Sequence, residues 1–319
     1  MNKGILILGN GFDLSLGRKT SYISFGKSEY WPFSIDRRIK VGRSAQRLSD
    51  FLNEKLNNVN SWFDLESLLG EYSVPLNEYD SPMVEELNVE NEYKGLLSAL
   101  SDYLKNQEST IAVNQDSLAA IVMRAVFQNG KFKIFNFNYT DIDLIAKLIH
   151  ASGSAETCYV HGSLKDNSII LGIESKNGIP PYINFFCKEY SPFYESNSLI
   201  RDLEMADEII FFGHSLSAID YHYFERFFSN LSSYDYLPES KKVKNISIFT
   251  ADEKSRRLIL DQLMVMNHNR LDLLFANTNL QFFTTIDNTV TPKLQKLLDR
   301  LDAQSKRADE RKLKAFTGI

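Results

Sequence analysis

Four segments of the chain place glycine, amide or imidazole groups directly after an apolar run. The first is Gly9-Asn10-Gly11-Phe12-Asp13, which follows the aliphatic residues 4–8. Glycines at the end of a buried strand let the backbone turn sharply beside a pyrophosphate, and the next helix supplies free N–H groups. Leu14 stands where the usual motif has its third glycine, so a tight turn without a ligand is the alternative. We interpret the segment as a phosphate loop.

The second segment is Asn136-Phe137-Asn138-Tyr139-Thr140-Asp141, where a predicted strand ends and a helix over residues 142–150 begins. Strand alternation places Asn136 and Asn138 on one face and the neighbouring phenylalanines on the other. Polar side chains at the carboxyl end of a parallel strand point into the crevice where α/β proteins bind ligands. The alternative for each asparagine is a hydrogen bond to a neighbouring loop. Thr140 and Asp143 have capping-box spacing.

The third segment is His161-Gly162, at the end of a predicted strand over residues 157–160. An imidazole that titrates near neutrality suits acid–base chemistry or a contact with a ribose hydroxyl, and the glycine clears space beside it. The alternative is a structural histidine.

A fourth turn, Gly213-His214-Ser215-Leu216-Ser217-Ala218-Ile219-Asp220, follows the apolar residues 208–212. Glycine and hydroxyl groups at a strand-to-helix turn can donate hydrogen bonds to phosphate or ribose, although Ser217 and Asp220 also have the spacing of a capping box without any ligand. Residues 248–252 repeat this arrangement and could face an adenine or a ribose.

The elements that position these segments predict an α/β protein with a doubly wound, mostly parallel sheet. Short apolar runs alternate with amphipathic helical patterns such as residues 142–150 and 254–266, and this alternation is typical of a parallel sheet covered by helices. We expect the core in residues 1–38 and 131–290, a helical insertion in 39–130 and a C-terminal helical tail in 291–319. The predicted strands cover residues 4–8, 133–137, 157–160, 168–171, 208–212, 246–249 and 280–283.

In the insertion and the tail, Arg43 to Leu56, Ser61 to Leu69, Val84 to Leu104 and Gln115 to Phe127 carry helical patterns. Thr291 is expected to cap the last helix, with Pro292 at its first position. The charged end of this helix is interpreted as a solvated face.

Composition excludes several classes of protein. The chain has 319 residues and a net charge of −5, which argues against a general electrostatic hold on nucleic acid or on an anionic membrane. Two cysteines, Cys158 and Cys187, stand far apart, so neither a disulfide scaffold nor a zinc ribbon is expected. No charged-then-apolar leader and no membrane-spanning run precede or interrupt the pattern. We expect a cytoplasmic protein without a metal.

Together the motifs resemble the abortive-infection AbiH family, which is grouped with sirtuin-like, Rossmann-type NAD-binding domains. The similar pieces are scattered in order over most of the chain: residues 7–14, 20–22, 62–66, 136–141, 160–162 and 213–220.

The resemblance implies a role for each segment toward NAD. Gly9 and Gly11 would touch the pyrophosphate, and Asn10, Phe12 and Asp13 beside them are expected to bind the cofactor. Asn138 would face the nicotinamide ribose, and His161 would be the base. Other expected cofactor-binding residues are Asn136, Asp141, Gly213, His214, Ser215 and Asp220.

The resemblance also implies antiphage defence through NAD depletion. The four cysteines that hold zinc in deacylating sirtuins are absent from this sequence, which favours hydrolysis of the nicotinamide–ribose bond over deacylation. Trp62, Asp64 and Glu66 would roof the nicotinamide end. We expect the turns around Gly11, Asn138 and Gly213 to converge on one cleft, with His161 at its edge.

Two alternatives stay open. A non-catalytic sensor of NAD or ADP-ribose would keep the glycine turns without using His161 as a base, and would signal to a partner protein. A toxin directed at nucleic acid lacks a basic, aromatic-rich cluster to support it. A homo-oligomer or a partner from the same defence system is compatible with the sequence.

Overall fold

A computed structural model describes residues 4–33, 46–58, 64–77, 81–110, 112–175, 179–236 and 243–317. It divides the chain into two compact units. The first comprises Met1–Arg18, Ala112–Val160 and Ser196–Ile319, and the second comprises Lys19–Ile111 and His161–Glu195. These boundaries differ from the expected ones. Residues 19–33 and 161–195, which were expected in the core, belong with the helical unit. Residues 112–130, expected in the insertion, and the tail from residue 291 belong with the sheet.

The first unit is built on a parallel sheet with the order β3-β2-β1-β4-β5-β6 among the described residues. This is the strand order of a Rossmann-like fold, in which the chain reverses direction across the sheet between β1 and β4. The strands are β1 (Gly4–Leu8), β2 (Phe132–Asn136), β3 (Glu156–Tyr159), β4 (Glu208–Phe212), β5 (Lys244–Thr250) and β6 (Thr278–Thr284).

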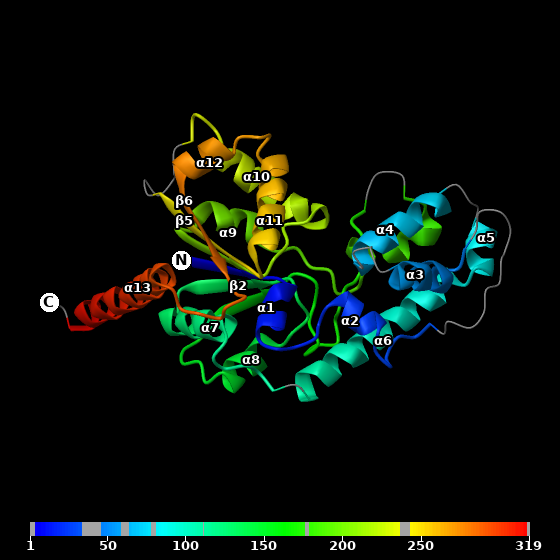
Figure 1. The fold of residues 1–319 in the computed structure, drawn as a ribbon, viewed down its shortest axis with the longest axis horizontal. Coiled ribbons are helices and arrows are strands. Elements are labelled where there is room, and N and C mark those ends of the chain that lie inside the picture. Colours follow the sequence, from blue (N-terminus) through cyan, green and yellow to red (C-terminus); the bar gives the residue numbers. More distant parts are fainter. Residues whose placement is uncertain are drawn as a thin grey trace. The chain divides into compact units, whose positions relative to one another are not determined.

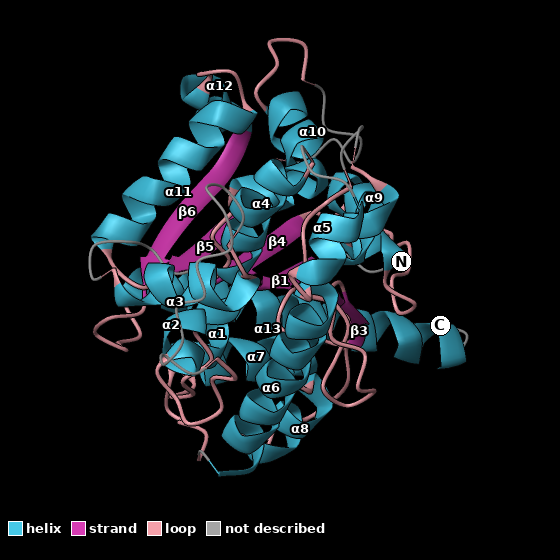
Figure 2. Ribbon diagram, turned by 90° about the vertical axis from the view of Figure 1, so that its right-hand side faces the viewer, coloured by secondary structure: helices cyan, strands magenta, loops and turns pink. Residues whose placement is uncertain are grey.

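Helices cover both faces of this sheet, as Figures 1 and 2 show. Alternate residues of β1 enter opposite cores: Leu6 and Leu8 pack with one set of helices, and Ile5 and Ile7 with the other. The continuous apolar runs in the sequence follow from this burial on two sides. The first set is α7 (Leu118–Asn129), α8 (Ile142–Leu148) and α13 (Pro292–Thr317); the second is α9 (Leu199–Met205), α10 (Tyr221–Leu231), α11 (Glu253–Met266) and α12 (Leu271–Asn277).

The second unit is helical and has an aromatic core. Tyr93 packs edge-on against Phe186 with ring centroids 5.1 Å apart, and Tyr72 meets the same ring at 6.3 Å. The elements are α2 (Tyr22–Gly26), α3 (Leu48–Asn57), α4 (Leu65–Leu76), α5 (Ser81–Glu86), α6 (Val89–Thr110) and the 3₁₀ turns η1 (Pro181–Phe186) and η2 (Lys188–Tyr190).

Most predicted elements are present, and the exceptions have local causes. Residues 168–171 form no strand, because Gly162 (φ +75°) turns the chain back so that the Ile170 N–H donates to the His161 carbonyl. The helix expected over 84–104 is divided at Asn88, whose φ of +56° is left-handed. Thr291 caps α13 as expected, since its hydroxyl accepts from the Leu294 N–H.

Among the described residues, no helix combines the length and the apolar content that crossing a bilayer requires.

Candidate functional site

The turns after β1 and β4 meet through their backbones in the first unit. The Gly9 N–H donates to the Phe212 carbonyl, and the Gly11 N–H donates to the Gly213 carbonyl, both at 3.0 Å. The Gly213 N–H in turn donates to the Phe249 carbonyl at 3.0 Å. Hydrogen bonding between β1, β4 and β5 therefore continues past the ends of the strands into the turns.

Close backbone approach explains the glycines in these two turns. A Cβ atom on Gly11 would lie 2.7 Å from the Cα atom of Gly213, and one on Gly213 would lie 2.4 Å from the Cα atom of Gly11. Gly213 also has a φ of +64°, which favours glycine. The sequence suggested that Gly11 is needed to approach a phosphate. In the structure its amide is bonded to Gly213, so the turn-to-turn contact alone accounts for this glycine.

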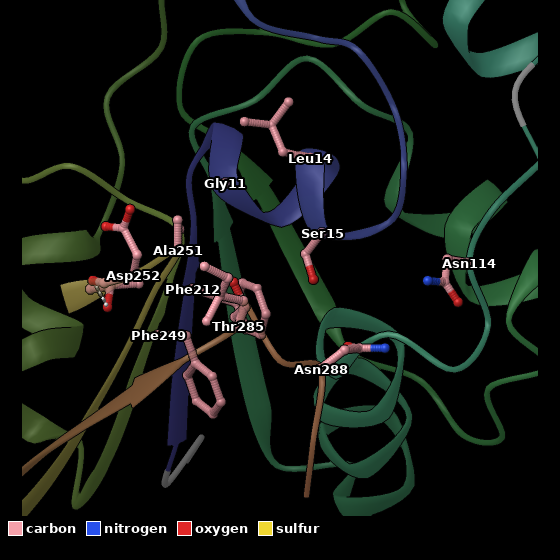
Figure 3. Close-up of a pocket in the computed structure, with 13 residues that line it drawn as sticks. Gly11, Leu14, Ser15, Asn114, Phe212, Phe249, Ala251, Asp252, Thr285 and Asn288 are labelled. Carbon is pink, nitrogen blue, oxygen red and sulfur yellow. Dashed lines mark hydrogen bonds between the residues drawn. The ribbon is translucent and has the colours of Figure 1, made fainter. Parts of the chain in front are cut away.

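A pocket of about 380 Å³ opens beside this contact, at the carboxyl ends of β1, β4, β5 and β6. Its volume lies within the range of roughly 300–1,000 Å³ that is usual for small-molecule sites. Figure 3 shows Asp252 and Asn114 on opposite sides of it, with Ser15 directed toward it from α1 (Asn10–Ser15). The lining residues are Gly11, Leu14, Ser15, Asn114, Phe212, Gly213, Phe249, Thr250, Ala251, Asp252, Thr285, Ile286 and Asn288.

Two stacked aromatic rings lie in the wall of the pocket, and each is only 1% exposed. Phe212 and Phe249 are 4.8 Å apart between centroids and 11° from parallel, and Phe249 stacks in the same way on Phe283. Phe12, which was expected at the cofactor, is instead buried against Phe212 in the core. The exposed apolar side chains of the pocket are Leu14 and Ile286, and hydroxyl, amide and carboxylate groups stand at its rim.

Asp252 is the carboxylate at this rim, and it also caps α11. Its side chain accepts a hydrogen bond from the Ser255 N–H at 2.7 Å. Hydrogen bonds from the backbone and side chain of Ser255 hold the pKa of Asp252 below its ordinary value, so the residue is anionic at neutral pH. Residues 250–252, which the sequence suggested could face a base or a ribose, thus line the pocket.

Asn138 joins the turn after β2 to the turn after β1. Its Nδ2 donates to Asp13 Oδ2 at 2.6 Å and to the Gly9 carbonyl at 2.9 Å, and Thr140 donates to Asp13 Oδ1 at 2.8 Å. Asp13 is fully buried, and Arg18 Nη1 lies 3.7 Å from it. Because both acceptors require an N–H group, they fix the orientation of the Asn138 amide. The structure therefore brings together the three turns around Gly11, Asn138 and Gly213.

Two polar residues near Asn138 have structural roles. Asn136 is fully buried; it accepts from the Asn138 N–H and donates to the Thr140 carbonyl, so it shapes the turn. Asp141 caps α8 by accepting from the backbone N–H groups of residues 143 and 144. The capping box expected from Thr140 is therefore wrong, because the Thr140 hydroxyl is directed to Asp13 instead.

The turn after β4 contains a buried histidine. His214 Nδ1 accepts from the Leu216 N–H at 3.0 Å, and its Nε2 lies 3.5 Å from Asp220 Oδ2. Its ring packs edge-on against Phe137 at 4.5 Å. Ser215 is exposed, and the Ser217 side chain makes no capping bond. None of His214, Ser215 and Asp220 lines the pocket, and their role as ligand contacts stays a prediction.

His161 belongs to the second unit and contacts a lysine that the sequence did not suggest. Lys188 Nζ lies 3.2 Å from His161 Nε2 and 3.1 Å from both Glu66 carboxylate oxygens. No motif marks Lys188, which is the first residue of the short 3₁₀ turn η2. The expected placement of His161 at the edge of the cleft stays a prediction, as do the roles of Asp64 and Glu66, and Trp62 lies outside the described residues.

The sequence also missed Asn114, Thr285 and Asn288, which reach the pocket from loops without a recognisable pattern. Asn288 holds the start of α7, since its Oδ1 accepts from the Leu118 N–H at 2.7 Å. Within the described part of the chain, no group of three His, Cys, Asp or Glu side chains is arranged to hold a metal ion.

Comparison with known families decides the identity of the chain. The family model described as Bacteriophage abortive infection AbiH matches residues 5–236. The chain belongs to the AbiH family. The matched region of this AbiH protein runs from β1 past Asp220, so it includes the turns that hold Gly11, Asn138, His161 and Gly213. Membership supports a role in phage abortive infection. No curated protein and no solved structure matches the chain.

Proposed function

We propose that this AbiH protein binds NAD at the carboxyl edge of its sheet and hydrolyses the nicotinamide–ribose bond during abortive infection. One observation carries the proposal: the pocket lies where the strand order reverses, beside the contact between Gly11 and Gly213. In open α/β sheets, ligands bind at this reversal, outside the carboxyl ends of the strands. The resemblance of the motifs to sirtuin-like domains is the reason for proposing NAD as the ligand.

The pocket suits one nucleoside of the dinucleotide. The exposed side chains of Leu14 and Ile286 offer an apolar surface to a base, and the anionic Asp252 and the hydroxyl group of Ser15 offer partners to ribose hydroxyls. Apolar contact with the base and hydrogen bonding of the sugar hydroxyls are usual means by which such sites hold small ligands. Asp252 would repel a phosphate, so we assign the pyrophosphate to the pocket edge farther from it.

The proposed reaction breaks the C–N bond between ribose and nicotinamide. Its electron pair leaves with the nicotinamide nitrogen, and the oxygen of a water molecule attacks the anomeric carbon. The Asn138 side chain would position the ribose or this water through Oδ1, the atom opposite its bound Nδ2. His161 would take the water proton, a role that comes from the resemblance. The products are nicotinamide and ADP-ribose.

Nicotinamide release from NAD by the purified protein tests the proposal. His161→Ala and Asn138→Ala should each abolish release while the circular dichroism spectrum stays native. Full activity in both variants would refute the assignment of catalytic residues. Absence of release by the wild-type protein, together with absence of NAD binding in calorimetry, would refute the nucleotide site.

A sensor that binds NAD or ADP-ribose without turnover is the second candidate. It is favoured by the hydrogen bonds that already engage the Asn138 amide nitrogen and His161 Nε2, since both groups are held by protein partners. Calorimetry with NAD and with ADP-ribose, run beside the release assay, separates the two candidates. Micromolar binding of both nucleotides without nicotinamide release supports the sensor.

A further inference from the structure

Three titratable side chains form a buried cluster in the second unit. Lys188, His161 and Glu66 are only 4%, 5% and 8% exposed. The Lys188 ammonium lies 3.1 Å from the Glu66 carboxylate and 3.2 Å from His161 Nε2. A buried ammonium is costly unless it is paired with an opposite charge and hydrogen-bonded. The Lys188 ammonium has Glu66 as its ion-pair partner and His161 as a hydrogen-bond acceptor.

The local backbone holds the cluster in place. Glu66 is in the first turn of α4, which Asp64 caps through the Ser67 N–H. The Lys188 N–H donates to the Ile173 carbonyl at 2.8 Å, beside the bridge between Ile173 and Cys187. The His161 carbonyl accepts from the Ile170 N–H at 2.8 Å. Each of the three residues is therefore fixed by a backbone or capping hydrogen bond near it.

The chemistry of the donors determines the protonation of the imidazole. An ammonium group has only donors, so His161 Nε2 must present its lone pair to Lys188, and a neutral ring then carries its hydrogen on Nδ1. A second positive charge on the ring, 3.2 Å from the ammonium, would be repelled.

Two titratable groups beside the cluster stay uncharged. Burial, followed by the charge of Glu66, raises the pKa of Tyr93 above its ordinary value, so the phenol stays neutral. Burial, followed by the charge of Glu189, raises the pKa of Cys187 to about 11, so the thiol also stays neutral.

We infer that Lys188 and Glu66 are positioning residues that hold His161 in the Nδ1–H tautomer. Lys188 donates to Nε2, and Glu66 keeps Lys188 charged. The role of this tautomer in catalysis rests on the proposed function. In the resting state His161 is a donor through Nδ1. It can take a proton at Nε2 only when Lys188 withdraws.

Nitrogen-15 NMR of histidine-labelled full-length protein tests the inference without any substrate. The chain has five histidines, so His161→Gln identifies the His161 ring signals by their loss. We expect a protonated Nδ1 and an unprotonated Nε2 in the wild type. In Lys188→Met the ratio of tautomers should shift toward Nε2–H by about tenfold, as expected for loss of one hydrogen bond to a charged group. Lys188→Arg should keep the wild-type pattern.

Controls separate this role from a purely structural one. If Lys188→Met does not fold, the double variant Lys188→Met with Glu66→Gln removes both charges of the pair and is measured in its place. A wild-type ring protonated on Nε2, or a tautomer that is unchanged when Lys188 is lost, overturns the inference. The expected tautomer shift without nicotinamide release would leave the inference standing and would refute only the hydrolase.

Discussion

Asn138 Nδ2 and Asp13 Oδ2 lie 2.6 Å apart, so a buried carboxylate sets the orientation of the amide that follows β2. The same carboxylate receives the Thr140 hydroxyl on its other oxygen at 2.8 Å. Asp13 is therefore occupied by the protein itself, and its effect on any ligand would pass through Asn138. This assigns to Asp13 a role different from the direct nucleotide contact that the sequence suggested.

The two donors to Asp13 provide a matched pair of variants. Asn138→Ala and Thr140→Val each remove one hydrogen bond from the carboxylate, so each should lower the free energy of unfolding by about 1–3 kcal/mol. Only Asn138→Ala should abolish nicotinamide release, because Thr140 is buried and its hydroxyl is directed to Asp13. Urea unfolding and the release assay measure the two effects. Equal loss of activity in both variants would mean that stability alone explains the result for Asn138.

Replacing the glycines of the touching turns should destabilise the first unit. Gly11→Ala and Gly213→Ala each force a Cβ atom against backbone, and we expect each to cost about 1–3 kcal/mol, as overpacking does. Gly95→Ala is the control, because no atom lies within 4 Å of its Cβ position in α6. It should stabilise the protein by about 0.5–1 kcal/mol. Thermal unfolding measures the stability of each variant. A Gly213→Ala variant as stable as the wild type would contradict the contact between the two turns.

Filling the pocket should prevent nucleotide binding without unfolding the protein. Ser15 is partly exposed and faces the pocket, so Ser15→Phe should place a ring in the space proposed for the nucleoside. We expect calorimetry to show at least about a tenfold weaker affinity for NAD, corresponding to about 1.4 kcal/mol. Ser154→Phe, at an exposed position outside the pocket, is the control. Unchanged affinity in Ser15→Phe would exclude this pocket as the site.

The two cysteines should differ in reactivity. Cys187 is buried, and burial together with the charge of Glu189 raises its pKa from 9.0 to about 11, whereas Cys158 is partly exposed. A thiol reagent at about pH 8 should therefore label Cys158 first and reach Cys187 only after unfolding. Mass spectrometry of the labelled peptides tests this order, and rapid labelling of native Cys187 would contradict it.

The same pKa makes a pH-dependent contribution to stability. Because the folded pKa of Cys187 exceeds the unfolded one, its contribution is complete below the ordinary thiol pKa and is lost as the pH rises through about 11. Cys187→Ala should therefore lose less stability than the wild type between about pH 8 and pH 11. Urea unfolding at both pH values measures the difference. Equal losses in the two proteins would show that the thiol does not titrate differently on folding.

The sheet could be predicted because its signals are local. Residues 4–8, 208–212 and 246–249 are apolar on both sides of the strand, and burial between two helical layers demands that pattern. Residues 168–171 carry a similar pattern without forming a strand. Their partner is the backbone of His161, a tertiary contact that no local pattern encodes.

The candidate site was harder to predict, because it also depends on tertiary contacts that no local pattern encodes. Glycine and asparagine at strand ends marked the turns around Gly11, Asn138 and Gly213, and the structure brings these turns together. The reason for the glycines, however, depends on which turn touches which, and that follows only from the strand order. Lys188 begins a 3₁₀ turn of three residues and Asn288 stands in a loop, and in such short or irregular segments spacing carries no information about the partner.

The ladder of backbone bonds that continues from β1, β4 and β5 into Gly9, Gly11 and Gly213 has a thermodynamic consequence. These turns are already ordered by the sheet, so a ligand that settles beside them has little loop entropy to remove on arrival. Their amide hydrogens should exchange with deuterium nearly as slowly as those inside the strands. The binding edge would then be preorganised, with its backbone in the same conformation before and after the ligand binds.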